Sequence, residues 1–365
     1  MTRMRLSLIV LATLAAALHG CASSGSGNAI PTVGAAAQDA SGAVRFGVGR
    51  IKIKEFSDLP LYSGYYFPDS ITSGPKKSLW VTDDIDQDSG ECAVVQIATS
   101  GTAVNTFYYS GPISEGSSLG GLTTGPDGNL WIPDYYNEQI LKMTPEGAFT
   151  SYPLNDFMAP IAIAVGRDHA LWFTERSGGS NSAIGRMTIK GKYTKYAASG
   201  WVYGIAAGPD GALWYTEETG NKIGRITTHG EIEEFSKGIS AGASPLSIAA
   251  GPDGALWFSE ATGGRIGRIT TSGKVTEYSR GITPTEEPFG IAAGPDNAMW
   301  FTEYETFGSY QIRESKLARI TMAGKISDYS KGLSGTSGPG DIVAGPDGNM
   351  WFVETYADRT GRLTL

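Results

Sequence analysis

The stretch Ile248–Tyr278, IAAGPDGALWFSEATGGRIGRITTSGKVTEY, contains four short runs of strand-forming residues separated by Gly-containing turns. We expect strands at IAA, ALWFSE, RIGRIT and KVTEY, with the alternation of large residues that is typical of paired sheets. PDG and TSGK supply residues that favour tight turns. The stretch therefore predicts a four-stranded antiparallel sheet, whose strands we name A to D in chain order.

The same pattern recurs along the chain, marked each time by a Trp that follows Leu or Met. The spacings between these Trp residues are 51, 41, 42, 43, 43 and 51. Four strands repeated every ~40–45 residues are typical of a β-propeller, in which each blade packs on its neighbours. We therefore predict an all-β fold, a seven-bladed β-propeller of four-stranded antiparallel blades. The seven residues are Trp80, Trp131, Trp172, Trp214, Trp257, Trp300 and Trp351.

The two ends of the repeats predict how the ring closes. IKEFS at Ile53–Ser57 matches strand D, whereas Trp351–Leu365 supplies only strands B and C of the last blade. An N-terminal strand that completes the last blade would remove an exposed sheet edge. We expect the propeller to span residues 44–365 and to unfold when Ile51–Phe56 is deleted.

The first residues predict export and lipid attachment. Two Arg residues precede a mainly apolar run, Leu6–Leu18, which is too short to span a membrane and is typical of a signal peptide. Leu18-His19-Gly20-Cys21 resembles the bacterial lipobox. We expect residues 1–20 to be a lipoprotein signal peptide and Cys21 to carry lipid; the alternative is ordinary secretion with cleavage nearby.

The residues after Cys21 predict where the protein is held. Residues 21–43 are rich in Ala, Gly and Ser without a hydrophobic period, as in a flexible tether. Ala22 favours the outer membrane, by resemblance to enterobacterial lipoprotein sorting. We expect a monomer that is lipid-anchored in the bacterial cell envelope and faces the periplasm or the surface. Only Cys92 then remains, so no intramolecular disulfide is expected.

Composition and charge exclude other classes of protein. The chain has 50 Gly in 365 residues, but its hydrophobic content of 41% does not fit low-complexity disorder. Lys and Arg number 29 against 37 Asp and Glu, giving a net charge of −8 without a basic cluster. Phosphate contacts need concentrated positive charge, so we expect no nucleic-acid partner.

Loop lengths favour one face of the disc as the functional face. In an up-and-down blade, the start of strand A and the B–C loop share a face, and the B–C loops are the ones that vary. The longest insert, Tyr304–Ser315, carries three aromatic residues, and Asp83–Glu91 is a shorter acidic insert. Because variable loops on a rigid scaffold usually carry function, we expect a small-molecule or protein ligand there. The alternative is tolerated sequence drift.

One residue per repeat, two positions before the strand A aliphatic residue, is expected to point into the central channel on that face. Most of these channel residues are apolar, as in sites for apolar or aromatic ligands. We predict a ligand site beside one carboxylate, or else side chains that plug the channel. The predicted ligand-binding residues are Asp69, Ile161, Tyr203, Leu246 and Phe289, and the other channel positions are Gly120 and Gly340.

Each repeat also has a carboxylate three residues after its Trp. A ring of acids suggests metal binding, but strand C offers a basic or polar residue in every repeat, so we expect cross-strand pairs. The acids are Asp83, Asp134, Glu175, Glu217, Glu260, Glu303 and Glu354, and the expected partners are Gln96, Lys142, Arg186, Arg225, Arg268, Arg319 and Arg362.

With GPDGALWFTE-like and IGRIT-like units around the ring, the chain resembles the streptogramin lyase (virginiamycin B lyase) family over residues 50–365. The resemblance implies a seven-bladed propeller that linearises cyclic depsipeptide antibiotics by magnesium-assisted elimination. It also implies His residues in the channel positions of the sixth and seventh blades, and a metal-binding Glu two residues before the latter. Here Phe289 and Gly340 replace the histidines, and Gly338 stands at the Glu position.

The remaining acids and histidines offer no clear replacement. His169 and His229 fall in A–B and C–D turns on the opposite face, whereas Glu286, Glu287 and Asp341 lie on the loop-rich face and could form another acid/base group. We predict a ligand- or protein-binding propeller, with no catalytic residue and no cofactor assigned. The alternative is a carbon–oxygen lyase that uses magnesium with a non-standard site, or a metal-dependent lactonase.

Overall fold

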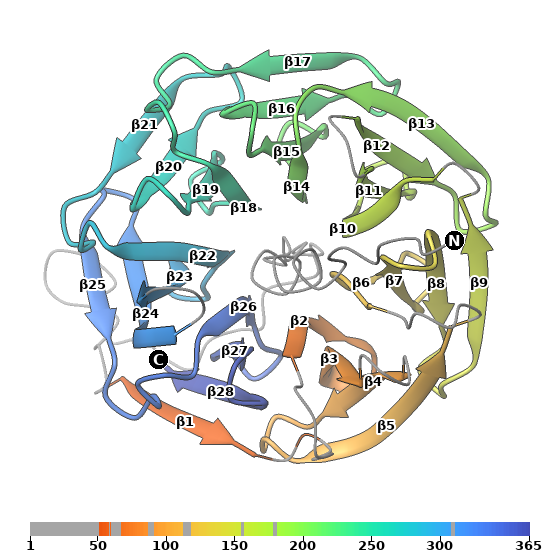
Figure 1. The fold of residues 1–365 in the computed structure, drawn as a ribbon, viewed down its shortest axis with the longest axis horizontal. Helices are drawn as coiled ribbons and strands as arrows, with labels where there is room; N and C mark the ends of the chain where they lie inside the picture. The colour runs from red at the N-terminus through yellow and green to blue at the C-terminus, as the bar shows by residue number, and fades with distance from the viewer. Residues whose placement is uncertain are drawn as a thin grey trace, which may run out of the picture.

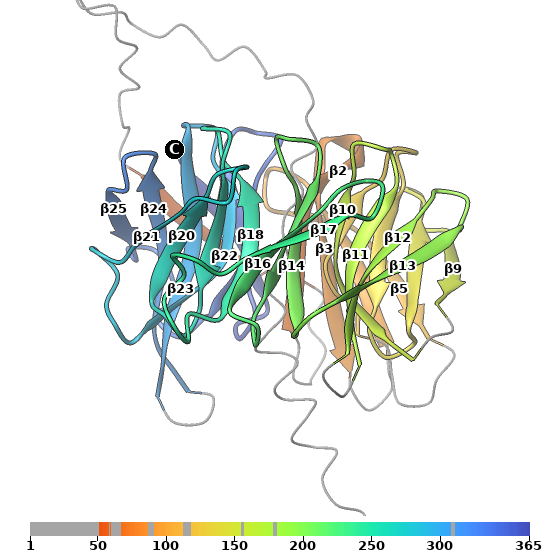
Figure 2. The ribbon, with the colours of Figure 1, turned by 90° about the horizontal axis from the view of Figure 1, so that it is seen from above.

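The computed structural model describes residues 51–57, 59, 67–86, 91–111, 118–154, 157–177, 181–307 and 311–365. Seven four-stranded antiparallel sheets are arranged in a ring around a central axis, which confirms the predicted seven-bladed propeller (Figure 1). From the side the sheets form a disc, and strands β23 (Ala298–Phe307) and β24 (Gln311–Thr321) extend beyond one face of it (Figure 2). The predicted signal peptide, lipid site at Cys21 and tether lie outside the described residues.

Strand A is innermost and strand D outermost in every blade (Figure 1). The 3-10 turn η1 (Pro75–Lys77) joins the first two strands of blade 1. Blade 1 is β2 (Phe67–Gly74), β3 (Ser78–Asp86), β4 (Glu91–Ile97) and β5 (Ala103–Ser110); blade 2 is β6 (Thr123–Thr124), β7 (Leu130–Asp134), β8 (Gln139–Met143) and β9 (Phe149–Pro153); blade 3 is β10 (Ala159–Val165), β11 (Leu171–Arg176), β12 (Ser182–Met187) and β13 (Tyr193–Ala198).

Blades 4 to 6 repeat this order. Blade 4 is β14 (Val202–Ala207), β15 (Leu213–Glu217), β16 (Lys222–Ile226) and β17 (Ile232–Phe235); blade 5 is β18 (Pro245–Ala250), β19 (Leu256–Glu260), β20 (Arg265–Ile269) and β21 (Val275–Tyr278); blade 6 is β22 (Glu286–Ala293), β23 (Ala298–Phe307), β24 (Gln311–Thr321) and β25 (Ile326–Tyr329).

Blade 7 is closed by the N-terminal strand, as predicted. It consists of β26 (Pro339–Ala344), β27 (Met350–Glu354), β28 (Arg359–Thr364) and β1 (Lys52–Phe56). β1 pairs antiparallel with β28, from Lys52 opposite Thr364 to Phe56 opposite Thr360. The strand that begins the described chain therefore occupies the outer edge of the last sheet.

One aromatic contact recurs at the joints between blades. In blade 5, the strand D residue Tyr278 stacks on Trp257 with ring centroids 5.5 Å apart. A Cβ on Gly324, in the C–D turn of blade 6, would overlap the Tyr278 ring, and Gly324 has φ +80°. Glycine is required there both for the close approach and for the backbone conformation. Equivalent pairs are Phe56–Trp351, Trp80–Phe107, Trp131–Tyr152, Trp172–Tyr196, Trp214–Phe235 and Trp300–Tyr329.

The predicted pairing of strand B acids with the strand C cations is wrong. Arg268 lies opposite Trp257 and not opposite Glu260. It donates to Asp253 of the A–B turn at 2.7 Å, and this carboxylate also accepts from Trp257 Nε1 at 3.1 Å. The strand register therefore directs the Arg to the turn. The same register sets Gln96, Lys142, Arg186, Arg225, Arg319 and Arg362 opposite their Trp residues.

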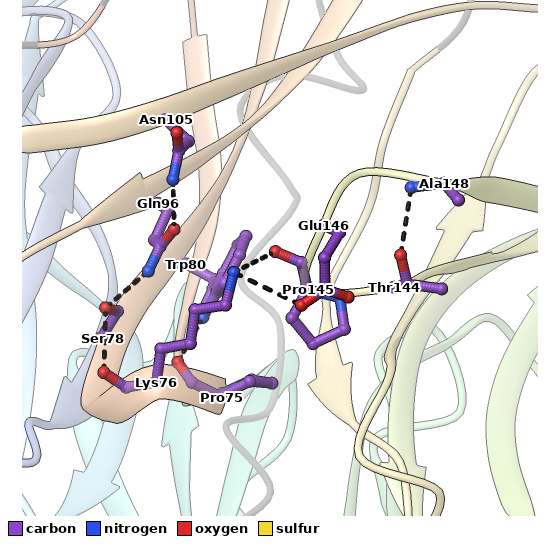
Figure 3. A network of polar contacts seen from close by, with 10 residues as sticks. All are labelled: Pro75, Lys76, Ser78, Trp80, Gln96, Asn105, Thr144, Pro145, Glu146 and Ala148. Atoms are coloured by element: carbon purple, nitrogen blue, oxygen red, sulfur yellow. Dashed lines mark hydrogen bonds and ion pairs between the residues drawn. The ribbon is translucent and has the colours of Figure 1, made fainter.

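Blade 1 builds this turn differently, because PKK replaces PDG. Trp80 Nε1 donates to the Pro75 carbonyl at 3.2 Å (Figure 3). Lys76, with φ 61°, reaches blade 2, where its Nζ donates to the Pro145 carbonyl at 2.8 Å and lies 3.6 Å from Glu146 Oε1 (Figure 3). Lys76 therefore links blade 1 to blade 2 at the turn position where the other six blades carry Asp.

Cys92 is fully buried and forms no disulfide. Among the described residues, no helix has both the length and the hydropathy needed to cross a membrane.

Candidate functional site

A β-bulge interrupts strand A in blades 1 and 3 to 7 and orients the channel residues. In blade 5, Leu246 and Ser247 lie in the bulge opposite Ser259. Ser259 Oγ accepts from Ser247 N at 3.0 Å and donates to the Phe289 carbonyl of the next blade at 2.6 Å. One hydroxyl thus fixes the backbone of two adjacent strands A at the channel. Equivalent hydroxyls that donate to the next channel residue are Thr82, Thr174, Thr216 and Thr302.

Four predicted ligand-binding residues meet in one apolar cluster at the channel. Ile161, Tyr203, Leu246 and Phe289 are 2%, 1%, 1% and 6% exposed, so they pack against one another at this level of the channel. Tyr304 of the B–C hairpin joins them, and its ring centroid lies 5.8 Å from that of Phe289. The fifth predicted residue, Asp69, lies in β2, and its side chain falls outside the described part of the structure.

A second ring of repeat positions lies four residues after each Trp, and three of its members border this cluster. Tyr135, Ala261 and Tyr304 belong to it and contact the apolar cluster. This ring was not predicted from the sequence, although a signal was present: the residue three after each Trp is always acidic, whereas the next residue differs from blade to blade. The ring consists of Asp84, Tyr135, Arg176, Glu218, Ala261, Tyr304 and Thr355.

Arg176 is the cation of this second ring, and aromatic rings surround it. Its guanidinium carbon lies 4.9, 5.3 and 5.7 Å from the ring centroids of Tyr203, Trp201 and Tyr135. Nη1 donates to Tyr203 Oη at 2.5 Å, and the residue is 8% exposed. Burial is the largest influence on Tyr203 and raises the pKa of its hydroxyl to about 12 despite the neighbouring cation. Tyr203 therefore stays protonated at neutral pH.

Two of the three acids proposed from sequence as an acid/base group, Asp341 and Glu286, have separate environments. Asp341 accepts from Ser70 Oγ at 2.7 Å and Ile71 N at 3.1 Å, so it joins β26 to β2 of blade 1. Glu286 forms an ion pair with Lys316 and accepts from Thr283 N. Burial raises the pKa of Asp341 to about 7. These contacts assign Asp341 to ring closure and Glu286 to the blade 6 hairpin.

The ring of strand B acids is buried, and in blades 4 to 7 a strand D acid accompanies each one. In blade 5, Glu260 is 0% exposed; Arg265 lies 3.9 Å from Glu260 and 4.0 Å from Glu277. Burial, then the Glu277 charge, raises the pKa of Glu260 to about 8. One cation therefore serves two carboxyl groups, and the buried one keeps its proton at neutral pH. Equivalent pairs are Glu217–Glu234, Glu303–Asp328 and Glu354–Glu55.

The described residues do not fit the magnesium that the family resemblance implies. No group of three or more His, Cys, Asp and Glu side chains in the described part of the chain is arranged to hold a metal ion. Phe289 and Gly340, at the positions of the implied histidines, offer no ligand atom in their side chains. His169 and His229 are exposed in turns that join β10 to β11 and β16 to β17, as expected from their place in the repeat.

Several solved structures resemble this chain. A streptogramin B lyase is 30% identical, with a TM-score of 0.71, over 86% of this chain and 98% of the lyase. Virginiamycin B lyase from Staphylococcus aureus is 31% identical, with a TM-score of 0.72, over 86% and 99%. A catalytically inactive histidine-to-alanine variant of that enzyme, with quinupristin, is 32% identical over the same shares, with a TM-score of 0.71. No protein-family model and no curated protein matches the chain.

Proposed function

Because the chain belongs to the streptogramin B lyase (virginiamycin B lyase) family, we propose that it keeps the ligand-recognition face of that fold but acts as a binding module without lyase activity. The ligand is a small molecule or peptide with an apolar, aromatic body. It binds at the channel mouth on the B–C loop face. This proposal separates recognition of the ligand from the elimination chemistry.

The observation that carries the proposal is the chemistry at two channel positions. Elimination needs a base beside the acidic carbon and a group that stabilises the developing negative charge. Phe289 has no titratable group and packs on Tyr304, and Gly340 has no side chain. In the similar S. aureus enzyme, a histidine-to-alanine change gives a catalytically inactive protein. We infer that the same loss of function has occurred here through Phe289 and Gly340.

Aromatic side chains on the same face support recognition of an apolar ligand. Tyr135 and Tyr136 follow strand B of blade 2 and meet edge to face, with centroids 5.3 Å apart. Tyr136 is 37% exposed, and Phe157, just before strand A of blade 3, is 84% exposed. Together with Trp201 these rings can bury an apolar surface at little cost in side-chain entropy.

We expect the chain from Ala22 onward, which retains every described strand, to bind quinupristin without changing it. Calorimetry measures the binding, and mass spectrometry with proton NMR follows the antibiotic in the presence of magnesium. Elimination leaves the mass unchanged and creates an alkene that NMR detects, whereas hydrolysis adds water. Tyr203→Ala and Phe289→Ala are expected to weaken binding by roughly tenfold or more, as for other buried aromatic anchors.

Tyr108→Ala is the matched control, because Tyr108 is 49% exposed on the outermost strand of blade 1. It should leave the affinity unchanged, and thermal melts establish that each variant is folded. A magnesium-dependent alkene product would overturn the proposal in favour of the lyase alternative. Wild-type affinity in both channel variants would instead show that the ligand binds elsewhere.

We also propose that the propeller is lipid-anchored in the cell envelope through Cys21. The lipobox-like Leu18–Cys21 and the Ala/Gly/Ser-rich tether support this placement. Bacteria that express the full chain are expected to incorporate labelled palmitate into it and to retain it in the membrane fraction. Cys21→Ala should abolish both, since acyl chains supply the membrane affinity. Labelled protein in the Cys21→Ala variant would contradict the proposal.

A further inference from the structure

We propose that Arg176, with Tyr135, Trp201 and Tyr203, forms a carboxylate-binding subsite for a ligand whose remaining body is apolar. The inference rests on the proposed binding function and adds the chemical class of the ligand. Arg176 ends strand β11 of blade 3, and Tyr135 follows β7 of blade 2. Trp201 directly precedes strand A of blade 4, and Tyr203 lies in that strand. The subsite thus lies where three blades meet at the channel mouth.

Among the described residues, Arg176 has no carboxylate counterion, unlike the Arg residues of strand C. In blades 3 to 6, the strand C Arg donates to a turn Asp at 2.6 to 2.8 Å. Arg176 is more buried than these residues, yet no carboxylate of the described chain lies within ion-pair distance of it, and it donates to the neutral Tyr203 hydroxyl. A buried charge without a counterion is costly unless something else pairs with it. A ligand carboxylate would supply that partner in a geometry that suits the planar guanidinium.

The position of Arg176 in the repeat also points to a ligand. The other members of the second ring are acidic, aromatic or small, and Arg176 is its one basic residue. The fold does not require a basic residue at this position, because the other blades form the same strand B without one. Burial raises the pKa of the neighbouring ring member Glu218, while the charge of Arg176 acts in the opposite direction. The two described side chains form no ion pair, so a ligand carboxylate could pair with Arg176 at the mouth.

The surface beside the guanidinium is apolar. Tyr203 connects Arg176 to the apolar cluster of Ile161, Leu246 and Phe289. A ligand that places its carboxylate on Arg176 would lay its body against the half-buried Tyr135 and Trp201, beside this buried cluster. The combination selects an aromatic or aliphatic carboxylate, such as the C-terminus of an apolar peptide, over a neutral molecule of the same shape.

The test compares N-acetyl-L-phenylalanine with N-acetyl-L-phenylalanine amide, two probes that differ in charge but hardly in shape. Changes in Trp fluorescence and NMR titration measure both affinities on the chain from Ala22 onward. We expect the acid to bind roughly tenfold more tightly than the amide, as for a charge-assisted bidentate contact. Arg176→Gln should bring the two affinities together.

Arg167→Gln is the control, because Arg167 is an exposed Arg in the A–B turn on the opposite face, and it should keep the preference. If Arg176→Gln does not fold, Arg176→Lys should keep the preference in reduced form, since it retains the charge but loses the planar fork. Equal affinities in the wild type, no binding of either probe, or a preference that survives Arg176→Gln would overturn the subsite. Quinupristin binding is measured separately. If quinupristin still binds when the carboxylate preference is absent, the subsite is wrong but the proposed binding function stands.

Discussion

A chain that lacks residues 51–56 is expected to lose the cooperative fold of all seven blades. Strand β1 supplies the outer strand of blade 7, and its removal exposes the edge of β28. Phe56 stacks on Trp351 at 5.4 Å and packs in the same cluster as Ile71 and Val81 of blade 1. The ring would therefore lose both its last strand and the apolar contact between its first and last blades.

Phe56 also completes the recurring joint between blades. A Cβ on Gly101, in the C–D turn of blade 1, would overlap the Phe56 ring, just as a Cβ on Gly324 would overlap Tyr278 of blade 5. Phe56→Ala alone is expected to cost about 3–5 kcal/mol, the range for a buried Phe. Glu55, whose carboxylate accepts from Ser334 and pairs with Arg359 at 3.1 Å, fixes the same strand beside its neighbours.

Urea and thermal unfolding followed by circular dichroism measure these effects. The matched control is deletion of residues 22–43, which removes a longer segment but no described strand and should leave the melting temperature unchanged. Phe56→Leu should recover much of the stability that Phe56→Ala loses, because it refills the cavity. A chain without residues 51–56 that melts cooperatively near the wild-type temperature would contradict closure through β1.

The fold could be predicted because each blade repeats the same local pattern of strands and turns. Apolar alternation, turn glycines and one Trp per blade indicated the number of blades, and the unmatched strand at Ile53–Ser57 indicated the closure. The channel residues followed from their position before strand A, and Ile161, Tyr203, Leu246 and Phe289 do meet.

Contacts across strands were harder to predict, because they depend on register and not on composition. Arg268 and Glu260 are both recurrent and opposite in charge, yet the register sets Arg268 opposite Trp257. Arg176 was not predicted for a related reason. It stands at a position where the residue differs from blade to blade, whereas the predictions rested on positions that repeat. The residue three positions after each Trp is always acidic, whereas the next residue varies although the blades hold it in the same geometry. Variation at such a position can indicate a functional residue.

The strand B acids show how a repeat can be uniform without forming a metal site. In blade 7, Glu354 is 0% exposed and opposes Arg359, which pairs with Glu55 at 3.1 Å. Burial and the Glu55 charge raise the pKa of Glu354 to about 8. The cation is thus shared, and the inner carboxyl remains neutral by keeping a proton. Each such blade then tolerates two acids and one cation in its sheet.

We therefore expect stability to fall as the pH rises from about 5 to about 8. Burial raises the folded-state pKa of Glu260, Glu303 and Glu354 to about 8, from the ordinary Glu value of 4.5 that applies in the unfolded chain. Between these values the folded chain binds more protons than the unfolded chain, so the free energy of unfolding decreases with pH. The slope is at most about 1.4 kcal/mol per pH unit for each carboxyl. Glu55, whose pKa is lowered, acts in the opposite direction below pH 4.5.

Thermal melts of the chain from Ala22 onward at intervals from pH 5 to pH 9 test this expectation. Glu260→Gln, Glu303→Gln and Glu354→Gln keep the shape of the side chain but cannot ionise, so each should flatten the slope and raise the melting temperature at pH 9 relative to the wild type. Glu231→Gln, in an exposed turn, is the matched control and should do neither. A melting temperature that rises between pH 5 and pH 8, or Gln variants with the wild-type slope, would show that these carboxyls are ionised in the folded protein. In that case blades 4 to 7 would have to hold four buried negative charges, including that of Glu217, beside the strand D acids.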